Sequence, residues 1–214
     1  MYEHIDSWKN AEDAFRQQLQ LNIKELTTQP PPHWEHFIEF LKMLIPITRV
    51  IDIGCGAGVY GYISNYVERD YIGYDYSPNA IELAKKSWKE LSDVQLPGNT
   101  NTIDYYCKDY KELPEAENPD QDLLVANAIC DVLPNGHECL KFLLGLKYRY
   151  LLIQRVSMID KIEYYDEYQA YNITTYKYHH NKDKTIALIE DMGYNVSPVL
   201  LYEDTYDLEI IIND

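Results

Sequence analysis

The stretch VIDIGCGAGVYG, residues 50–61, decides the fold of this chain. An apolar run that is typical of a buried β-strand ends here in Gly54, Gly56 and Gly58, and a helical pattern begins directly after them. Glycine adopts positive φ angles and lets a ligand approach the backbone closely, and a helix N-terminus offers unpaired N–H groups. The stretch therefore predicts a strand–turn–helix unit that holds a ligand.

Two carboxylates beside this turn indicate the kind of ligand. Asp75 ends the next predicted strand, YIGYD, 21 residues after Gly54, where an acid can accept hydrogen bonds from both ribose hydroxyls of an adenosine. Asp52 would repel a pyrophosphate, but it would attract the amino group and the sulfonium of S-adenosylmethionine. Residues 56–61 also match the dinucleotide pattern G-x-G-x-x-G, although the match starts two residues after the strand ends. An NAD(P)-dependent oxidoreductase and a non-catalytic binding module therefore remain alternatives.

Outward from the turn, short apolar runs alternate with helical patterns. Strands are predicted at 49–53, 71–75, 103–107, 122–128 and 148–154, and helices up to about residue 68 and at 77–91, 137–146 and 183–193, with a polar loop at 92–101. The last two strands, 195–202 and 207–213, are so close in sequence that they must pair antiparallel. The pattern predicts a Rossmann-like α/β fold: a doubly wound seven-stranded sheet, mostly parallel, with a C-terminal antiparallel hairpin and helices on both faces.

Two segments outside this alternation are expected to select the substrate. Residues 1–45 are predicted to be helical from Ile5 onward, with a break at Pro30–Pro32, and to form a cap or lid on a core of residues 46–214. An insert at 155–182 follows the fifth strand and contains six tyrosines. Tyrosine suits sugar rings and aromatic or polar small molecules, and packing against the domain is an equal alternative for these side chains.

VIDIGCGAG and YIGYDYSPNAIELAKK resemble motif I and the following strand and helix of class I S-adenosylmethionine-dependent methyltransferases. The resemblance covers residues 46–214; it implies S-adenosylmethionine as cofactor, S-adenosylhomocysteine as product and a sheet that ends in a hairpin. It also implies a set of cofactor-binding residues at the strand ends: Asp52, Gly54, Cys55, Gly56, Gly58, Asp75, Tyr76, Ser77, Asp109, Tyr110, Asn127 and Ala128. Many relatives carry His-His-Leu or Glu-His-Leu where this chain has Asp131-Val132-Leu133, so no catalytic residue is carried over.

The sequence offers only weak candidates for a catalytic base, and a structural role is the alternative for each of them: Asp131, His33, His36, His179 and His180. Arg155, directly after the fifth predicted strand, could hold a carboxylate or hydroxyl of the substrate, or pair with a surface acid. The layout of SWKNAEDAF, PPPHWEHF, LLIQR and the tyrosine-rich insert is also similar to bacterial methyltransferases associated with surface-glycan genes. That likeness is the basis for considering a glycan acceptor.

The net charge of −16, from 35 acidic and 19 basic residues, disfavours nucleic acid and anionic membrane surfaces as partners. We expect a small-molecule or glycan substrate. The sequence leaves the choice between a monomer and a homodimer open. The N-terminus lacks the pattern of a signal peptide, and no apolar run reaches the roughly 20 residues that cross a bilayer. The four cysteines fit no zinc motif. We therefore expect no metal, and a cytoplasmic protein with reduced thiols.

Overall fold

The computed structural model describes residues 4, 6–92 and 101–213. The first apolar position of the N-terminal pattern, Ile5, and most of the loop predicted at 92–101 lie outside the described residues. Among the described residues, no helix combines the length and the apolar character needed to cross a membrane.

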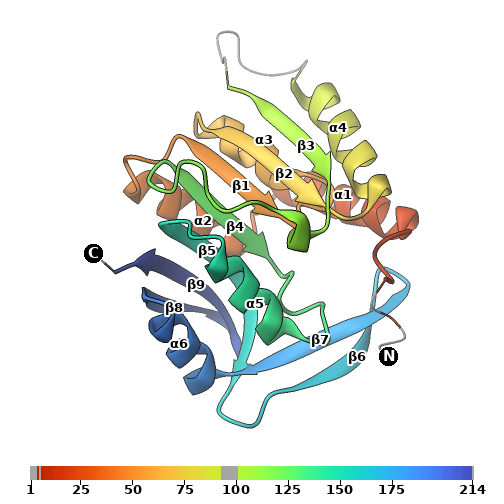
Figure 1. Cartoon of the computed structure of the whole chain (residues 1–214). Helices are drawn as coiled ribbons and strands as arrows, with labels where there is room; N and C mark the ends of the chain where they lie inside the picture. Colours follow the sequence, from red (N-terminus) through yellow and green to blue (C-terminus); the bar gives the residue numbers. More distant parts are fainter. Residues whose placement is uncertain (1–3, 5, 93–100, 214) are drawn as a thin grey trace.

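A mixed sheet forms the centre of the molecule (Figure 1). Its parallel strands are β1 (Arg49–Ile53), β2 (Asp70–Asp75), β3 (Ile103–Cys107), β4 (Asp122–Asn127) and β5 (Tyr150–Ile159). They lie in the order β3-β2-β1-β4-β5, and β9 (Thr205–Ile212) pairs antiparallel with β5. The neighbour of β9 is β8 (Tyr194–Tyr202), also antiparallel. The predicted Rossmann-like seven-stranded sheet with its antiparallel C-terminal hairpin is confirmed.

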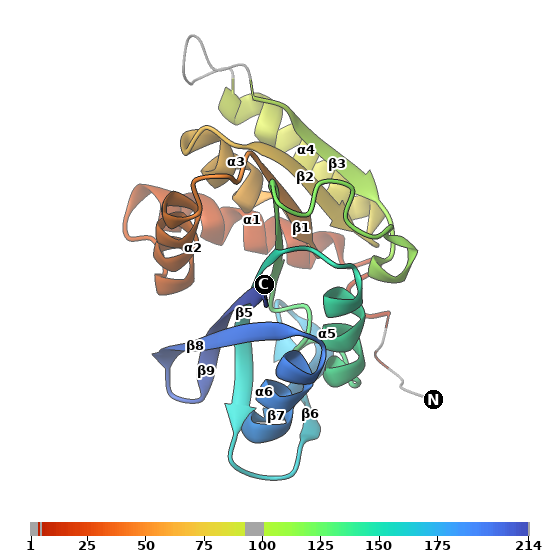
Figure 2. The same cartoon turned by 60° about the vertical axis from the view of Figure 1, so that its left-hand side comes forward.

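Helices cover both faces of the sheet, because alternate side chains of the buried strands point to opposite faces. Val50 packs in one apolar cluster with residues of α2 (Pro32–Met43), α3 (Val59–Tyr66) and α4 (Pro78–Ser92). Ile51 and Ile53 pack in the other, with α5 (Gly136–Gly145) and α6 (Lys182–Asp191). Figure 2 shows α2 and α3 on one side of the sheet and α5 on the other. The remaining helix, α1 (Glu12–Thr27), packs on α4.

The fifth strand is longer than predicted and carries the tyrosine-rich insert. Beyond an irregularity between Ile153 and Val156, β5 resumes its pairing with β9 and continues to Ile159. The next two strands, β6 (Tyr164–Ala170) and β7 (Ile173–Asn181), form an antiparallel hairpin, and β7 joins the sheet parallel to the end of β5. Predicted residues 155–182 are therefore the second half of β5 plus this hairpin, which brings the described strands to nine.

The first helix begins at Glu12, later than the apolar pattern predicted, and residues 6–10 form turns. The side chain of Trp8 packs on the β6–β7 hairpin as well as on Phe15 of α1, whose ring lies 5.6 Å from its own between centroids. Its Nε1–H donates to Thr175 Oγ1 at 3.0 Å, and its ring lies edge-on to Tyr171 at 6.2 Å between centroids. In Figure 1 the segment that leads into α1 passes beside the tip of this hairpin.

Candidate functional site

A cavity of about 640 Å³ lies at the carboxyl ends of the parallel strands, where α/β sheets bind ligands. We describe its wall as two sides. The glycine-turn side consists of Gly54, Gly56, Asp75, Tyr76, Asp109 and Tyr110. The Arg155 side consists of Trp8, Asn127, Arg155, Tyr168, Ala170 and Tyr171. A cavity of this volume can hold a cofactor together with a small molecule.

The glycine turn between β1 and α3 exposes backbone to the cavity. Gly54, Gly56 and Gly58 have φ angles of 74°, 52° and 81°, which a residue with a Cβ adopts only at a cost. A Cβ at Gly54 would lie 3.2 Å from Ile129 Cδ1, so the turn also packs closely on the loop after β4. At the start of α3, the N–H of Ala57 donates to Gln18 Oε1 of α1 at 3.2 Å. The turn therefore presents the close backbone approach that its sequence predicted.

Asp75, at the end of β2, is almost fully buried but lines the cavity. Its two carboxylate oxygens accept hydrogen bonds from the N–H groups of Gly56 and Ser77, both at 2.9 Å. Burial raises the pKa of Asp75 to about 6, against the lowering effect of these two hydrogen bonds. The group is thus ionised at neutral pH, and it can accept further hydrogen bonds from hydroxyls in the cavity.

The side chain of Asp52, which the sequence predicted beside the cofactor, does not line the cavity. The alternation of side chains along β1 turns Asp52 to the face covered by α3 and gives the cavity position to Ile53. Tyr71 OH donates to Asp52 Oδ2 at 2.6 Å, and Oδ1 has no hydrogen-bond partner. Burial above all raises the pKa of Asp52 to about 7. Asp52 would therefore act on a ligand electrostatically, from behind the cavity wall, and not by direct contact.

Three other predicted cofactor residues also lie behind the wall rather than on it: Cys55, Gly58 and Ser77. Tyr105 OH donates to the carbonyl of Gly58 at 3.1 Å, and Ser77 Oγ donates to the carbonyl of Lys9 at 2.8 Å. The buried thiol of Cys55 faces the same interior as Tyr71 and Tyr105. These residues support the turn and tie the N-terminal segment to it.

The predicted residues after β3 and β4 do line the cavity. Asp109 caps the short 3₁₀ helix Tyr110–Glu112, accepting from Lys111 N–H at 3.0 Å, and Tyr110 follows it on the wall. After β4, Asn127 is followed by Ala128, which has a left-handed φ of 60° and donates its N–H to the carbonyl of Gln154 at 3.0 Å. A non-glycine residue in this conformation is held there by its surroundings, as is common at functional sites.

The tyrosines of the hairpin fall into two groups, one on the cavity wall and one in the interior. Tyr168 and Tyr171 line the cavity. Tyr176 and Tyr178 are buried in the body of the molecule. Tyr168 pairs with Thr175 and so faces the opposite side of the hairpin from Tyr176 and Tyr178, and Tyr171 lies in the turn between the strands. Two of these tyrosines therefore reach the cavity, and two pack in the interior.

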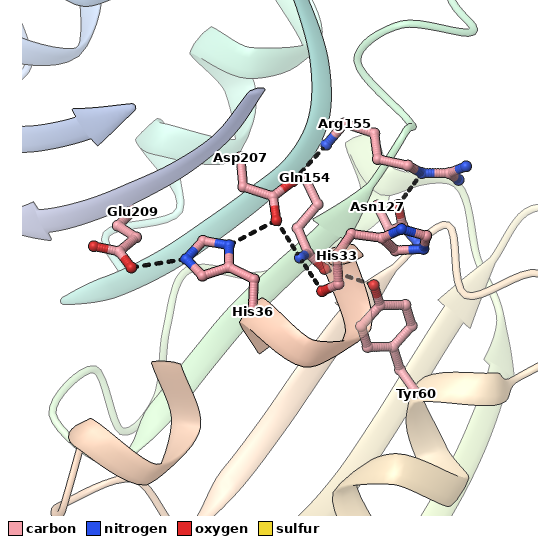
Figure 3. A network of polar contacts seen from close by, with 8 residues as sticks. All are labelled: His33, His36, Tyr60, Asn127, Gln154, Arg155, Asp207 and Glu209. Carbon is pink, nitrogen blue, oxygen red and sulfur yellow. Dashed lines mark hydrogen bonds and ion pairs between the residues drawn. The ribbon is translucent and has the colours of Figure 1, made fainter. Parts of the chain in front are cut away.

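A network of hydrogen bonds joins Arg155 to residues behind the wall (Figure 3). Arg155 has a left-handed φ of 56° at the irregularity of β5, and its backbone N–H donates to Asp207 Oδ1 at 2.9 Å. The fully buried Asp207 also accepts from Gln154 Nε2 at 2.7 Å. The same amide accepts from Tyr60 OH at 2.6 Å and donates to the carbonyl of His33 at 2.7 Å. This network holds β5 in the conformation that turns the Arg155 side chain to the cavity.

The two histidines of α2 that the sequence offered as bases, His33 and His36, do not line the cavity. His36 Nδ1 lies 2.7 Å from Asp207 Oδ2, and Nε2 lies 2.8 Å from Glu209 Oε1. The hydrogen bond with Asp207 is the main cause that raises the pKa of His36, against the effect of burial. Burial, and then the charge of Arg155, lower the pKa of His33 to about 3, so this ring is neutral.

The other proposed bases also do not line the cavity: Asp131 follows β4, and His179 and His180 lie on β7 of the hairpin. Asp131 Oδ2 accepts from Ser157 N–H at 2.9 Å, and Oδ1 lies 3.6 Å from His180 Nε2. His179 Nδ1 lies 2.8 Å from Ser157 Oγ, and Tyr164 stacks on its ring. These groups connect the loop after β4 to β5 and β7. In the described part of the chain, no group of three or more His, Cys, Asp or Glu side chains could hold a metal ion.

Sequence reasoning missed the partners that complete the site. Trp8, Phe15 and Gln18 line the cavity from the N-terminal segment and α1, whereas α2 packs in the core. Asp207 had one local signal, since an acid within the apolar strand TYDLEIII is unusual and calls for a buried partner. The identity of that partner, 52 residues earlier in the chain, had no local signal.

Comparisons with known proteins agree with this geometry. The model of a family described as "Methyltransferase domain" matches residues 46–186. The structure of magnesium protoporphyrin IX methyltransferase (ChlM) from Synechocystis PCC 6803 with bound S-adenosylmethionine is similar, with 16% identity and a TM-score of 0.62 over 85% of this chain and 80% of that one. The CcbJ methyltransferase from Streptomyces caelestis shows 9% identity and a TM-score of 0.65 over 98% of both chains. No curated protein matches the sequence significantly.

Proposed function

This chain belongs to the methyltransferase domain family and is an S-adenosylmethionine-dependent methyltransferase, and from that premise we propose that it methylates an oxygen or nitrogen atom of a small molecule or glycan. The observation that carries the proposal is the shared cavity. A cofactor-type wall and an aromatic wall with one arginine face the same space of about 640 Å³.

The glycine-turn side fits the cofactor. Gly54 and Gly56 would let the methionine and ribose portions approach the backbone, and Asp75 would accept the ribose hydroxyls. Asp109 would accept from the adenine amino group between the rings of Tyr76 and Tyr110. When bound, S-adenosylmethionine supplies a methyl group on a sulfonium sulfur and leaves as S-adenosylhomocysteine.

The chain's own contribution to the reaction is positional. Its two walls bring the acceptor atom to the methyl carbon, and such positioning can supply roughly 7–11 kcal/mol of the barrier reduction. The residues predicted as bases lie behind the wall. We therefore propose that the acceptor is oriented by Arg155, Asn127 and the hairpin tyrosines, and that its proton leaves to solvent.

A small acceptor is supported by the wall that would contact it. Trp8, Tyr168 and Tyr171 offer flat apolar faces, and two phenolic hydroxyls accompany them. Such a surface suits an aromatic molecule or a sugar ring. A glycan acceptor rests on these rings and on the sequence likeness to glycan-associated methyltransferases. The net charge of −16 disfavours a nucleic-acid acceptor.

Calorimetric titration with S-adenosylmethionine, S-adenosylhomocysteine and NAD tests the cofactor. We expect micromolar binding of the two sulfur ligands and none of NAD. Asp75→Ala should weaken the sulfur ligands by about 100-fold or more, because hydrogen bonds to a charged group contribute roughly 1.5–3 kcal/mol each. Asp104→Ala, which removes an exposed acid on β3 away from the cavity, should bind as the wild type does.

Absence of binding by either sulfur ligand would overturn the proposal, and so would NAD binding that depends on Asp75. A thermal unfolding curve for each variant separates loss of the fold from loss of the contact. Incubation with S-adenosylmethionine labelled in the methyl group then identifies acceptors, with sugars and aromatic small molecules as the first set.

A further inference from the structure

The guanidinium of Arg155 lies on the cavity wall without an ion pair to any acid in the described part of the chain. Its Nε donates to Asn127 Oδ1 at 2.7 Å, and that amide oxygen is neutral. Three of the other arginines pair with acids: Arg16 with Glu12, Arg49 with Asp122 and Arg149 with Asp120. In a chain with a net charge of −16, a cation left without an acid on a cavity wall indicates that its counter-ion arrives as a ligand.

Asp207 contacts Arg155 but does not neutralise its side chain. Its Oδ1 accepts from the backbone N–H of Arg155, and its Oδ2 faces His36 at 2.7 Å. Both ring nitrogens of His36 lie within hydrogen-bond distance of a carboxylate oxygen, so both donate, and the resulting imidazolium balances the Asp207 carboxylate. The hydrogen bond with Asp207 also raises the pKa of His36. Figure 3 shows the guanidinium on the far side of Arg155 from Asp207, beside Asn127.

The surroundings of the guanidinium are neutral and aromatic. All other members of the Arg155 side are uncharged, and two of them, Tyr168 and Tyr171, are tyrosines of the hairpin. The acids on the cavity wall, Asp6, Asp75 and Asp109, belong to the N-terminal turn and to the ends of β2 and β3. The charge on the Arg155 side is therefore that of one guanidinium whose remaining N–H groups are available to a ligand.

We propose that the methyl acceptor carries a carboxylate, which the guanidinium of Arg155 binds while the ring or apolar body of the acceptor lies against Tyr168 and Tyr171. The planar fork of a guanidinium matches the two oxygens of a carboxylate. The β5 irregularity and Asp207 fix the direction of the arginine before the ligand arrives. This inference rests on the proposed function, because it assigns the substrate class to the acceptor side of the same site.

One other anion could reach Arg155, namely the methionine carboxylate of the cofactor itself. The two assignments differ in a measurable way. If Arg155 binds the cofactor, its removal weakens the binding of S-adenosylhomocysteine but not that of 5′-methylthioadenosine, which lacks the amino-acid portion. If Arg155 binds the acceptor, its removal leaves both of these ligands unchanged.

The test uses the full-length protein saturated with S-adenosylhomocysteine and two pairs of probes: 4-hydroxybenzoate with 4-hydroxybenzamide, and glucuronate with glucose. Binding is measured by calorimetry for the wild type, for Arg155→Met and for the control Arg16→Met, which removes an exposed arginine of α1 that does not line the cavity. We expect at least one carboxylate to bind about 10- to 100-fold more tightly than its neutral partner. Arg155→Met should abolish that preference, and Arg16→Met should retain it.

The outcomes separate the proposals. S-adenosylhomocysteine binding to the wild type is measured first, and its absence would overturn the proposed function and this inference with it. If the cofactor product binds but neither carboxylate is preferred over its neutral partner, the inference alone is overturned. The inference is also overturned if Arg155→Met weakens the binding of S-adenosylhomocysteine at least tenfold while the binding of 5′-methylthioadenosine is unaffected. Thermal unfolding of Arg155→Met confirms that the variant is folded.

Discussion

The two sides of the cavity are built in different ways. Most of the glycine-turn side comes from residues 54–76, a single strand–helix–strand unit whose turn is set by local backbone chemistry. The Arg155 side is assembled from segments far apart in the chain: Trp8, Asn127, Arg155 and residues 168–171. Its central residue is aimed by Asp207, which lies on another strand.

This difference has a consequence for substitutions. A change within the glycine turn should damage cofactor binding directly, through the backbone that contacts the ligand. A change far from the cavity should damage the Arg155 side, because buried partners hold that side in place. Three predictions test the contrast, from the largest expected effect to the smallest.

The largest effect is expected from Asp207→Asn, which replaces a buried acceptor by an amide whose N–H groups face other donors. Gln154 Nε2 and the N–H of Arg155 both donate to this carboxylate, and His36 is its charge partner. Breaking such a buried pair costs roughly 3–5 kcal/mol of unfolding free energy. Denaturant unfolding measures the cost. S-adenosylhomocysteine binding by the folded variant should change little, while carboxylate binding should fall.

The matched control is Glu209→Gln, an acid-to-amide change two residues along the same strand. Its side chain is partly exposed and, within the described part of the chain, has a polar contact only with His36 Nε2. This change should lower the unfolding free energy by less than about 1 kcal/mol. Equal costs for the two variants would show that Asp207 has no special role on the Arg155 side.

An intermediate effect is expected from Gly58→Ala, in the glycine turn. The new Cβ would lie 2.9 Å from Ala84 Cβ and 2.7 Å from Tyr105 OH, at a φ of 81°. The left-handed conformation and the overpacking together should cost roughly 2–4 kcal/mol. S-adenosylhomocysteine affinity should fall with stability, which calorimetry and thermal unfolding can follow together. Gly145→Ala, in α5, should retain both the affinity and the stability, because the new Cβ would meet no described atom within 4 Å beyond its chain neighbours and the backbone of its own helix.

The smallest effect is a pH dependence from His36. Its pKa is raised in the folded state by the hydrogen bond with Asp207 above all. Hydrogen bonds between charged groups contribute roughly 1–3 kcal/mol to the unfolding free energy. The contribution of protonated His36 is therefore fully present below the unfolded-state pKa of about 6.5. It is lost as the pH rises through the raised folded-state pKa. The difference in unfolding free energy between wild type and His36→Gln should shrink over that interval.

His137→Gln provides a control of opposite sign, because burial lowers the pKa of His137. Protonation of His137 opposes folding in acid. The unfolding free energy of the wild type should therefore rise relative to that of His137→Gln as the pH rises from acid to neutral. A His36→Gln difference that is flat with pH would mean that the imidazolium does not balance Asp207.

Particular elements show where sequence reasoning succeeded. The turn at Gly54, Gly56 and Gly58 and the C-terminal hairpin were predicted because turn chemistry and strand spacing act over a few residues. Asp75 was located correctly on the cavity wall for the same reason, since it ends the strand next to the turn. Trp8 misled the helix prediction, because its partner Thr175 lies 167 residues away.

The sequence by itself determined the family, the cofactor and the order of strands and helices outside the β6–β7 hairpin, since these depend on periodicity, glycine conformation and the length of connections. Only the tertiary structure decided which acids and histidines reach the cavity. Alternation along β1 turned Asp52 inward, and the irregularity in β5 turned Arg155 outward. Whether a charged side chain serves a ligand or the core depends on the partners that surround it, and those partners come from distant parts of the chain.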